Sequence, residues 1–294
     1  MASNLFEPSA LIQYSIKLIR HSYYSFYMSW RLLDHSSSDI YWNLAYDEAI
    51  AKTDLGEENT LNTIRFWQSD LAVVIGRFQC VHKEVNLRYC EDNGIPIARR
   101  FTGGGTVYHD LGNLNFSLRL HQTHEYVPKG LKDLYEVFIS TLVKALVSLN
   151  IPAKFDPVGS CVRIGERKIS GTAGWIKQGV SFIHGTLLYD ADLVMLQKCI
   201  TPPLKQPTYL RDKTRIRCME SKRDTVTNIR NEVEDTPNLD EIKISILEHL
   251  EELTGAIAEK RNLTKDEGDT AQSLYESQYQ HRSWNLGTLA KFTS

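Results

Sequence analysis

The residues best suited to chemistry lie together in the stretch 99–113. Arg99 and Arg100 end a predicted strand, and three consecutive glycines follow at 103–105. A run of glycines gives up side-chain packing and costs backbone entropy, so it suits a place where backbone approaches another group closely or offers N–H groups to an anion. A guanidinium presents a planar fork to phosphate oxygens. Together with His109, these residues favour an anion or nucleotide site over the alternative, a plain glycine hairpin.

The glycines match neither of two common phosphate-binding patterns. They lack the Gly-Lys-Ser/Thr ending of a P-loop, and they do not open a predicted helix as the glycines of a dinucleotide-binding fold do. They lie between two strand-like segments, 95–100 and 106–108. We therefore expect a phosphate-contacting loop in a hairpin formed by these two segments.

Two further residues are candidates for the site. Lys168 follows a turn signal at 165–166 in a strand-like stretch, where a lysine can point into a cleft as a fixed cation. There it would neutralise a phosphate or the charge that develops during acyl transfer. A surface lysine on a hairpin is the alternative. His184 lies on another predicted strand, and we interpret it as a hydrogen-bonded core histidine rather than a general base.

The predicted elements mix hairpins with helices that follow groups of strands, which favours an α+β (mixed α/β) fold. The alternation in 114–120 predicts a half-buried strand. The apolar run 71–75 predicts a strand covered on both faces. The side chains of this run could line a slot for a ligand or belong to the core. A polar, acidic link is expected after 253. The expected strands are 30–33, 62–68, 71–77, 95–100, 106–108, 114–120, 161–164, 168–172 and 181–189, and the expected helices are 40–52, 84–93, 131–149, 192–199 and 239–253.

Composition narrows the class of protein. The formal charge of −2 gives no global electrostatic case for nucleic-acid binding, and no apolar run reaches the length of a membrane span. Five scattered cysteines without a C-x-x-C pair fit reduced thiols better than a disulfide framework. Residues 201–225 are polar and basic, which suits either a cationic loop beside a nucleotide or a solvated surface loop.

Five short motifs occur in one order along the chain, and with them the chain resembles the catalytic domain of lipoate–protein ligases. The resemblance is to the compact archaeal type, with the biotin/lipoate protein ligase catalytic fold, and it runs from about residue 28 to residue 287. The motifs are 43–48 (NLAYDE), 74–77 (VIGR), 98–113 (ARRFTGGGTVYHDLGN), 168–173 (KISGTA) and 184–188 (HGTLL).

The resemblance implies an ATP-dependent reaction in two steps. Lipoate and Mg-ATP give lipoyl-adenylate and pyrophosphate, and the lipoyl group then passes to a lysine of an acceptor domain. The acceptors it implies are the lipoyl domains of 2-oxoacid dehydrogenases and the glycine-cleavage H protein. Mg²⁺ would come with the nucleotide, with no fixed metal site in the protein.

The resemblance also implies roles for individual residues. Lys168 would be catalytic, because one fixed cation between the lipoate carboxyl and the α-phosphate lowers the repulsion between two anions. ATP or its adenylate would contact Arg100, Gly105, Thr106, Val107 and Tyr108, together with Lys168. Lipoate would contact Gly104, His109 and Lys168, and the supporting residues would be Arg99, Gly103, Asp110, Ser170, Gly171, Ala173 and His184.

The sequence departs from the family pattern in two places. Ser160 and Cys161 replace the usual Asn-Asp before the Lys168 hairpin, with Asp156 as a possible substitute for the carboxylate. The chain ends after 284–287, where many relatives begin a small accessory domain, so we expect a separate accessory subunit to support adenylation. Residues 1–27 are expected to be an extension, as a start placed too early or a transit peptide, with 28–294 as the catalytic domain. The expected location is the cytoplasm, or the mitochondrion if the extension is a transit peptide.

Two other functions stay open from the sequence alone. An octanoyltransferase would need an activated thiol, for which Cys161 and Cys199 are the candidates. A non-catalytic module would bind lipoate or its adenylate for delivery or sensing. The expected partners include neither nucleic acid nor a membrane.

Overall fold

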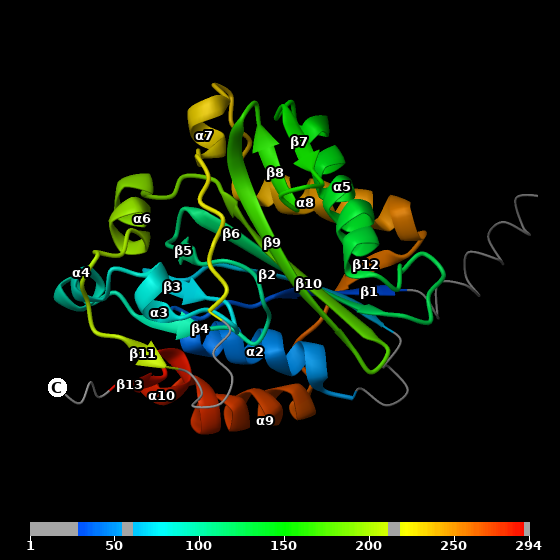
Figure 1. The fold of residues 1–294 in the computed structure, drawn as a ribbon. Helices are drawn as coiled ribbons and strands as arrows, with labels where there is room; N and C mark the ends of the chain where they lie inside the picture. Colours follow the sequence, from blue (N-terminus) through cyan, green and yellow to red (C-terminus); the bar gives the residue numbers. More distant parts are fainter. Residues whose placement is uncertain (1–28, 55–60, 211–217, 291–294) are drawn as a thin grey trace, which may run out of the picture.

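The fold is built on a large mixed sheet. The computed structural model describes residues 29–54, 61–210 and 218–290. Eight strands form the main sheet in the order β12-β1-β2-β6-β10-β9-β8-β7 (Figure 1). Their bounds are β1 (Ser29–Asp34), β2 (Asn62–Trp67), β6 (Asn113–His121), β7 (Ala153–Asp156), β8 (Cys161–Ile164), β9 (Arg167–Lys177), β10 (Val180–Leu188) and β12 (Ile257–Lys260).

Two small sheets and a set of helices complete the described chain. The strands β4 (Ile97–Arg99), β3 (Ala72–Ile75) and β5 (Val107–His109) pair in that order, and β11 (Tyr209–Leu210) pairs with β13 (Thr288–Leu289). The helices are α2 (Ile40–Lys52), α3 (Val81–Glu84), α4 (Leu87–Asp92), α5 (Leu131–Ser148), α6 (Leu193–Ile200), α7 (Ile229–Glu232), α8 (Leu239–Thr254), α9 (Lys265–Leu274), the π-helix η2 (Tyr275–Tyr279) and α10 (Arg282–Asn285).

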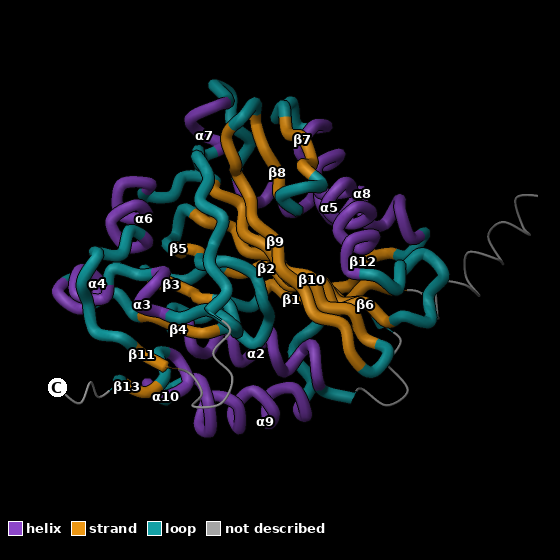
Figure 2. The backbone as a smooth tube through the Cα atoms, viewed as in Figure 1, coloured by secondary structure: helices purple, strands orange, loops and turns teal. Residues whose placement is uncertain are grey.

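Helices cover both faces of the main sheet (Figure 2). On one face, apolar side chains of β2, β6 and β10 pack against α5 and α8 in the main core. On the other face, α2 packs against Trp67 and against β3, with α9 behind it. This arrangement confirms the predicted α+β class, with mixed sheets flanked by helices.

Strand β6 is buried on both faces, so the prediction of a half-buried strand is wrong. Its polar residues Asn115, Ser117 and Arg119 are all buried. Ser117 donates a hydrogen bond of 2.8 Å to Asp47 of α2, and Arg65 of the neighbouring strand donates one of 2.6 Å to the same carboxylate. Polar partners inside the fold thus replace water on that face, which alternation in the sequence cannot reveal.

Most other elements follow the predicted ranges. Helix α2 has the predicted bounds, and its N-terminus is capped by the Asp39 side chain. The predicted helix 84–93 is instead two short helices, α3 and α4, which Asn86 separates by capping α4.

The predicted link after 253 is wrong. There β12 adds a parallel edge strand to β1, and α9 packs on α2. Glu267 of α9 forms a buried ion pair with Arg31 of β1 at 2.5 Å, so a polar helix is held by a partner more than two hundred positions earlier in the chain.

The cysteines also differ from the prediction of reduced thiols only. Cys80 and Cys218 form a disulfide across a sequence separation of 138 residues, with their Cα atoms 5.1 Å apart. The other three, Cys90, Cys161 and Cys199, are buried free thiols. No sequence spacing marks the pair, because only the tertiary fold brings its two segments together.

In the described ranges no helix is both long and apolar enough to cross a membrane. The predicted extension, 1–27, lies outside the described residues.

Candidate active site

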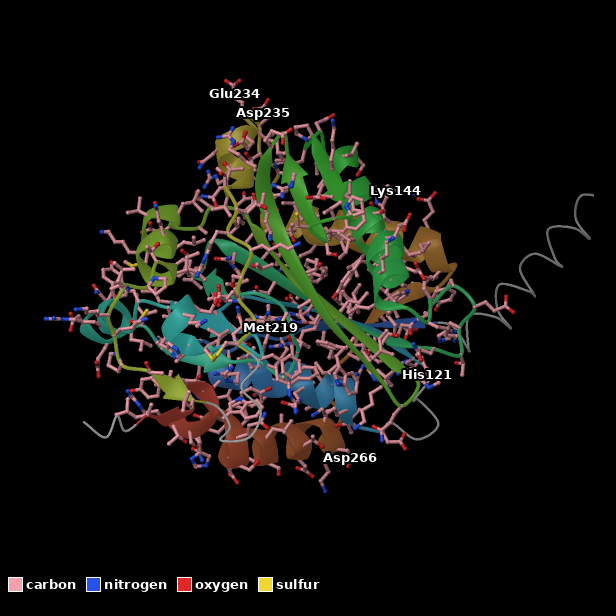
Figure 3. The ribbon with its side chains drawn as sticks, viewed as in Figure 1. His121, Lys144, Met219, Glu234, Asp235 and Asp266 are labelled. Carbon is pink, nitrogen blue, oxygen red and sulfur yellow. A yellow bond between two sulfur atoms is a disulfide. The ribbon has the colours of Figure 1, made fainter. Side chains whose placement is uncertain are left out.

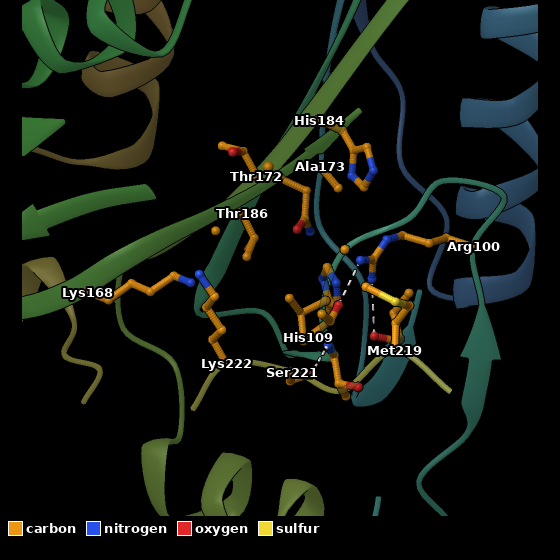
Figure 4. A pocket seen from close by; sticks show the side chains of 18 of the residues that line it. Arg100, His109, Lys168, Thr172, Ala173, His184, Thr186, Met219, Ser221 and Lys222 are labelled. Atoms are coloured by element: carbon orange, nitrogen blue, oxygen red, sulfur yellow. Dashed lines mark hydrogen bonds between the residues drawn. The ribbon is translucent and has the colours of Figure 1, made fainter. Parts of the chain in front are cut away.

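A cavity of about 350 Å³ opens on the face of the sheet that α2 covers (Figure 4). Its floor is a row of four residues on neighbouring strands, Gly171, Thr186, Asn115 and Trp67, which are direct partners across β9, β10, β6 and β2. Strands lie about 4.8 Å apart, so the row spans about 14 Å. Lys168 lies at the Gly171 end, and the other end is apolar.

The glycine loop 103–105 forms one wall of this cavity. Gly104 has φ +86°, a conformation that L side chains rarely adopt, and a Cβ on Gly76 would lie 2.1 Å from the Gly104 carbonyl oxygen. The Gly76 turn and the glycine loop are therefore packed backbone to backbone. The predicted loop is found here, between β4 and β5, but the predicted hairpin is wrong. Both strands pair with β3, which lies between them in the small sheet.

Arg100 braces this loop from inside. Its guanidinium donates hydrogen bonds of 2.6 Å to the Gly103 carbonyl and 2.7 Å to the Gly105 carbonyl, and one of 3.2 Å to the Thr102 hydroxyl. Burial lowers its pKa to about 10. Arg100 lines the cavity, but much of its hydrogen-bonding capacity is used in shaping the loop.

Arg99 serves the fold outside the cavity. Its guanidinium donates hydrogen bonds to the backbone carbonyls of Gly76 at 3.0 Å and of Gln79 at 2.8 Å, and to that of Trp284 at 3.0 Å. Arg99 therefore joins the Gly76 turn to the helix α10. Such a contact stabilises the fold around the site, which is what a supporting residue would do.

Two histidines that line the cavity, the buried His109 and the partly buried His184, lie beside the glycine loop. Burial, aided by the nearby Arg100, lowers the pKa of His109 to about 3, so its imidazole is neutral at physiological pH. His109 stacks on Trp67 with ring centroids 5.5 Å apart. His184 shares a 2.6 Å hydrogen bond with Thr102, and burial lowers its pKa too. Neither histidine is charged in the neutral range. His184 is hydrogen-bonded as expected, but it is only partly buried and lines the cavity rather than the core.

Asn115 is a polar group that sequence reasoning missed. It lies in the middle of the floor and is 1% exposed, and within the described structure neither its amide nitrogen nor its amide oxygen has a hydrogen-bond partner. An unsatisfied buried amide is costly, so such a group in a cavity points to a bound molecule or water. The only signal in the sequence was its place as one of the polar residues that alternate with apolar ones in 114–120.

A segment that we call the strap, residues 218–226, crosses the open side of the cavity; it is the yellow segment in Figure 1. Met219, Glu220, Ser221 and Lys222 of the strap line the cavity. In Figure 3, Met219 lies near the centre of the molecule, in front of the sheet. Residues 201–225 were expected to be either a cationic loop beside the site or a solvated surface loop. The strap matches the first interpretation, since it lines the cavity. Residues 211–217 lie outside the described residues.

Glu84 holds the strap against the glycine loop. The Ser221 hydroxyl donates a 2.5 Å hydrogen bond to the Glu84 carboxylate and accepts a 2.8 Å hydrogen bond from the Thr106 N–H. Arg223 forms an ion pair with Glu84 at 3.3 Å. On the other side, the Lys168 N–H donates to the Thr225 carbonyl at 2.9 Å.

A second cavity of about 120 Å³ adjoins the first, with Lys168, Gly171 and Thr186 lining both. The structure thus brings together most of the predicted site residues, and Gly103 and Asp110 line neither cavity. Asp110 accepts hydrogen bonds from the N–H groups of Gly112 and Asp192, both at 2.8 Å, and so shapes the turn after β5. The predicted residues that line a cavity are Arg100, Gly104, Gly105, Thr106, Val107, Tyr108, His109, Lys168, Ser170, Gly171, Ala173 and His184.

At the departure, Asp156, Ser160 and Cys161 line neither cavity, although the adjacent Gly159 lines the first one. Asp156 accepts from the Gly159 N–H and forms an ion pair with Arg163 at 2.9 Å, and these contacts lower its pKa to about 2. The carboxylate offered as a substitute is therefore engaged with Arg163. Burial raises the pKa of the Cys161 thiol, and Cys199 is buried in the apolar cluster around β3. Neither thiol is placed as the nucleophile of an octanoyltransferase.

The apolar run 71–75 was expected either to line a ligand slot or to belong to the core, and the structure divides it between the two. Val74 lines the cavity, whereas Val73 and Ile75 face the apolar cluster on the opposite side of β3. Sequence reasoning also missed Leu44, Phe78 and Thr172 in the lining. Among the described residues no group of three or more His, Cys, Asp or Glu could hold a metal ion.

Fold and site together define an adenylate-forming acyl ligase of the lipoate type, with a glycine loop, one catalytic lysine candidate and an apolar slot. The comparisons agree. Residues 39–251 match the family model for the lipoyl protein ligase A/B catalytic domain, so the chain belongs to that family. The chain is 31% identical over 271 residues to lipoate-protein ligase A subunit 1 of Thermoplasma acidophilum, covering 88% of this chain and 97% of that protein.

Solved structures show the same fold. A crystal structure of a lipoate-protein ligase A bound with ATP has a TM-score of 0.73 and 30% identity, covering 88% of this chain and 99% of the other. A bipartite lipoate protein ligase, solved in work that includes its E2 lipoyl domain from Thermoplasma acidophilum, has a TM-score of 0.74 and 29% identity, covering 91% of this chain and 100% of the other. The predicted enzyme class, a lipoate–protein ligase, is confirmed.

Proposed function

We propose that this chain activates lipoate with ATP and transfers the lipoyl group to a lysine of a lipoyl acceptor domain, with Lys168 as the catalytic residue. The observation that carries the proposal is the cavity itself. It joins a lysine and a glycine loop to a floor that is long enough for a lipoyl chain and apolar at the end away from the lysine.

The first step joins two anions. A lipoate carboxylate oxygen forms a bond to the α-phosphorus of ATP, the bond from that phosphorus to the β-bridging oxygen breaks, and pyrophosphate leaves with the electron pair. Lys168 would lie between the carboxylate and the α-phosphate, where its charge lowers their repulsion and stabilises the transition state. The glycine loop would offer backbone N–H groups to the phosphates.

The second step needs no protein nucleophile. The neutral amine of the acceptor lysine attacks the acyl carbon of lipoyl-adenylate, an amide forms, AMP leaves, and the amine releases a proton. Lys168 would again stabilise the charge on the oxygens that leave with AMP. The apolar end of the floor, with Trp67, Leu44 and Val74, would hold the dithiolane end of the lipoyl group.

The remaining roles follow the family resemblance. Gly105, Thr106, Val107 and Tyr108 would bind the nucleotide together with Arg100, whose main contribution is to hold the loop in shape. Gly104 and His109 would contact lipoate. Mg²⁺ would arrive with ATP and be held by its phosphates.

The partners are proposed from the relatives. The similarity to one subunit of a bipartite ligase supports a separate accessory subunit that assists adenylation. The same system includes an E2 lipoyl domain, which supports 2-oxoacid dehydrogenase acceptors; the H protein is a further expected acceptor. The cytoplasm is the proposed compartment, with the mitochondrion as the alternative.

The test offers the purified chain an apo lipoyl domain with either lipoate and Mg-ATP or pre-made lipoyl-adenylate, and acceptor mass is read by mass spectrometry. We expect modification from lipoyl-adenylate and little from lipoate and ATP without an accessory subunit. Lys168→Ala should lose about 1,000-fold or more in transfer rate. Absence of modification in both regimes, or full activity in Lys168→Ala, would refute the proposal.

A further inference from the structure

A second lysine ammonium lies beside that of Lys168. Lys222, from the strap, lines the same two cavities as Lys168. In Figure 4 the two side chains come from opposite sides and point their ammonium ends toward one another. Lys222 belongs to none of the five family motifs, and sequence reasoning gave it no role beyond its membership of a basic loop.

The carboxylates around these lysines are engaged elsewhere. Glu84 binds Ser221 and Arg223, Asp224 forms a 2.6 Å ion pair with Arg163, and Glu220 pairs with Lys83 at 2.8 Å. Within the described ranges neither lysine side chain makes an ion pair. Asp224 lines the smaller cavity with both lysines and interacts electrostatically with Lys168, but its ion pair is with Arg163. Two ammonium groups on one cavity repel each other, and an anion bound there relieves that repulsion.

The backbone on both sides of Lys222 is fixed, so its position is built into the fold. Before it, the Met219 N–H donates to the Phe78 carbonyl at 3.0 Å, and the Ser221 N–H donates to Glu84 at 2.9 Å. After it, residues 225–227 exchange two backbone hydrogen bonds with Lys168, of 2.9 Å and 3.0 Å. The same short segment therefore positions both lysines relative to each other.

We infer that Lys222 is a second phosphate-binding cation that clamps the phosphate chain of the nucleotide against Lys168. The inference rests on the proposed function and deepens it. A fixed lysine is a point charge suited to a phosphate chain. Lys222 acts on the nucleotide and on the departing pyrophosphate, whereas Lys168 also contacts the lipoate carboxyl. Removal of Lys222 therefore weakens binding of ATP and pyrophosphate more than it slows transfer from lipoyl-adenylate.

The test measures binding of ATP and of inorganic pyrophosphate to the full chain by calorimetry. The variants are Lys222→Gln, Lys222→Arg and, as a matched control, Lys205→Gln, which removes an exposed lysine from the same basic stretch. We expect Lys222→Gln to weaken both ligands about 10- to 100-fold. Lys222→Arg should stay within about threefold because it keeps the charge, and Lys205→Gln should match the wild type.

A thermal melt of each variant separates loss of the clamp from loss of fold. If Lys222→Gln melts like the wild type and binds pyrophosphate and ATP as tightly, the inference is wrong. It is also wrong if the wild-type chain binds neither ligand, or if Lys222→Arg fails as Lys222→Gln does while still folded. Transfer from lipoyl-adenylate is measured on the same preparations. If the chain binds nucleotide through Lys222 but lipoylates no acceptor, the proposed function is wrong and the inference about Lys222 stands.

Discussion

The floor of the cavity and the strap that crosses it are held by different forces. The floor is a row of four sheet positions fixed by backbone ladders and packed against helices on both faces. The strap has no extended ladder; side-chain hydrogen bonds to Glu84, one disulfide and a single bridge at Lys168 hold it. Damage to the sheet and the packed glycine wall should therefore cost folding free energy, whereas damage to the strap should cost ligand affinity.

The difference suits the two substrates. The lipoyl chain is mostly apolar and needs a permanent dry slot, which only a packed sheet can supply. The nucleotide is highly charged and must enter and leave, so its cations are better placed on a segment whose contacts can be broken one at a time. Lys168 lies where the two regions meet.

The largest expected effect comes from breaking the glycine wall beside the floor. Gly76→Ala would place a Cβ 2.1 Å from the Gly104 carbonyl oxygen, which neither backbone can avoid without moving. We expect the free energy of unfolding to fall by about 2–3 kcal/mol, measured by urea titration. Gly268→Ala is the control, because no heavy atom lies within 4 Å of its new Cβ in the helix α9. Gly268→Ala should raise the free energy of unfolding by up to about 1 kcal/mol. If both variants lose the same free energy of unfolding, the close packing of Gly76 against Gly104 is wrong.

The next effect tests the floor by pH. Burial and Arg100 depress the pKa of His109 to about 3 in the folded chain, below an ordinary value of 6.5. Between these values the unfolded chain binds more protons, so stability rises with pH and falls as pH is lowered. His109 alone should remove about 2 kcal/mol between pH 6.5 and pH 5. Urea titrations across this range should show a shallower fall in His109→Gln, and parallel curves would show that His109 is not buried as described.

Substitution of Glu84 should lower the free energy of unfolding only slightly but should clearly weaken ATP binding. Glu84→Gln keeps the shape of the side chain but removes the charge that holds Ser221 and Arg223. We expect ATP affinity to fall about 3- to 10-fold through a looser strap, with less than about 1.5 kcal/mol lost from folding. Glu259→Gln is the matched control, because Glu259 lines neither cavity and its pair with Arg261 is largely exposed and worth little. Should folding suffer more than binding, the contrast between strap and floor would be wrong.

The smallest effect sharpens the comparison, since it changes the floor without damaging the fold. Asn115→Leu replaces an amide that has no protein partner among the described residues by an apolar side chain of similar size. An octanoyl chain leaves that amide unsatisfied, whereas a dithiolane sulfur is at least a weak acceptor. We expect the ratio of kcat/KM for octanoate over lipoate to rise about threefold. ATP affinity in the same variant is the internal control, and an unchanged ratio would place Asn115 away from the acyl chain.

The sequence reveals local features well, because helix caps, turns and periodicity act over a few residues. Helix α2 is predicted to the residue, and the hairpin that carries Lys168 is predicted from Gly165 and its neighbours. The order of motifs identifies the family, which the comparisons confirm. The glycine loop is also predicted as a loop between strands, because no helix signal follows it.

Long-range contacts decide the rest. The burial of Ser117 depends on Asp47 of a distant helix, the strand β12 depends on pairing with β1, and the disulfide joins Cys80 to a segment 138 positions later. None of these partners leaves a local pattern, so the sequence suggested a solvated face, an unstructured link and free thiols at these places.

The sequence by itself determined the family, the catalytic lysine candidate and the glycine loop, because these lie in short motifs whose residue types state their chemistry. Only the tertiary structure decided which arginine braces the loop, which buried amide is left for a ligand, and that Lys222 meets Lys168. The physical reason is that a charge or amide acquires its role from the groups that surround it, and in this fold those groups come from strands, helices and a strap that lie far apart in the chain.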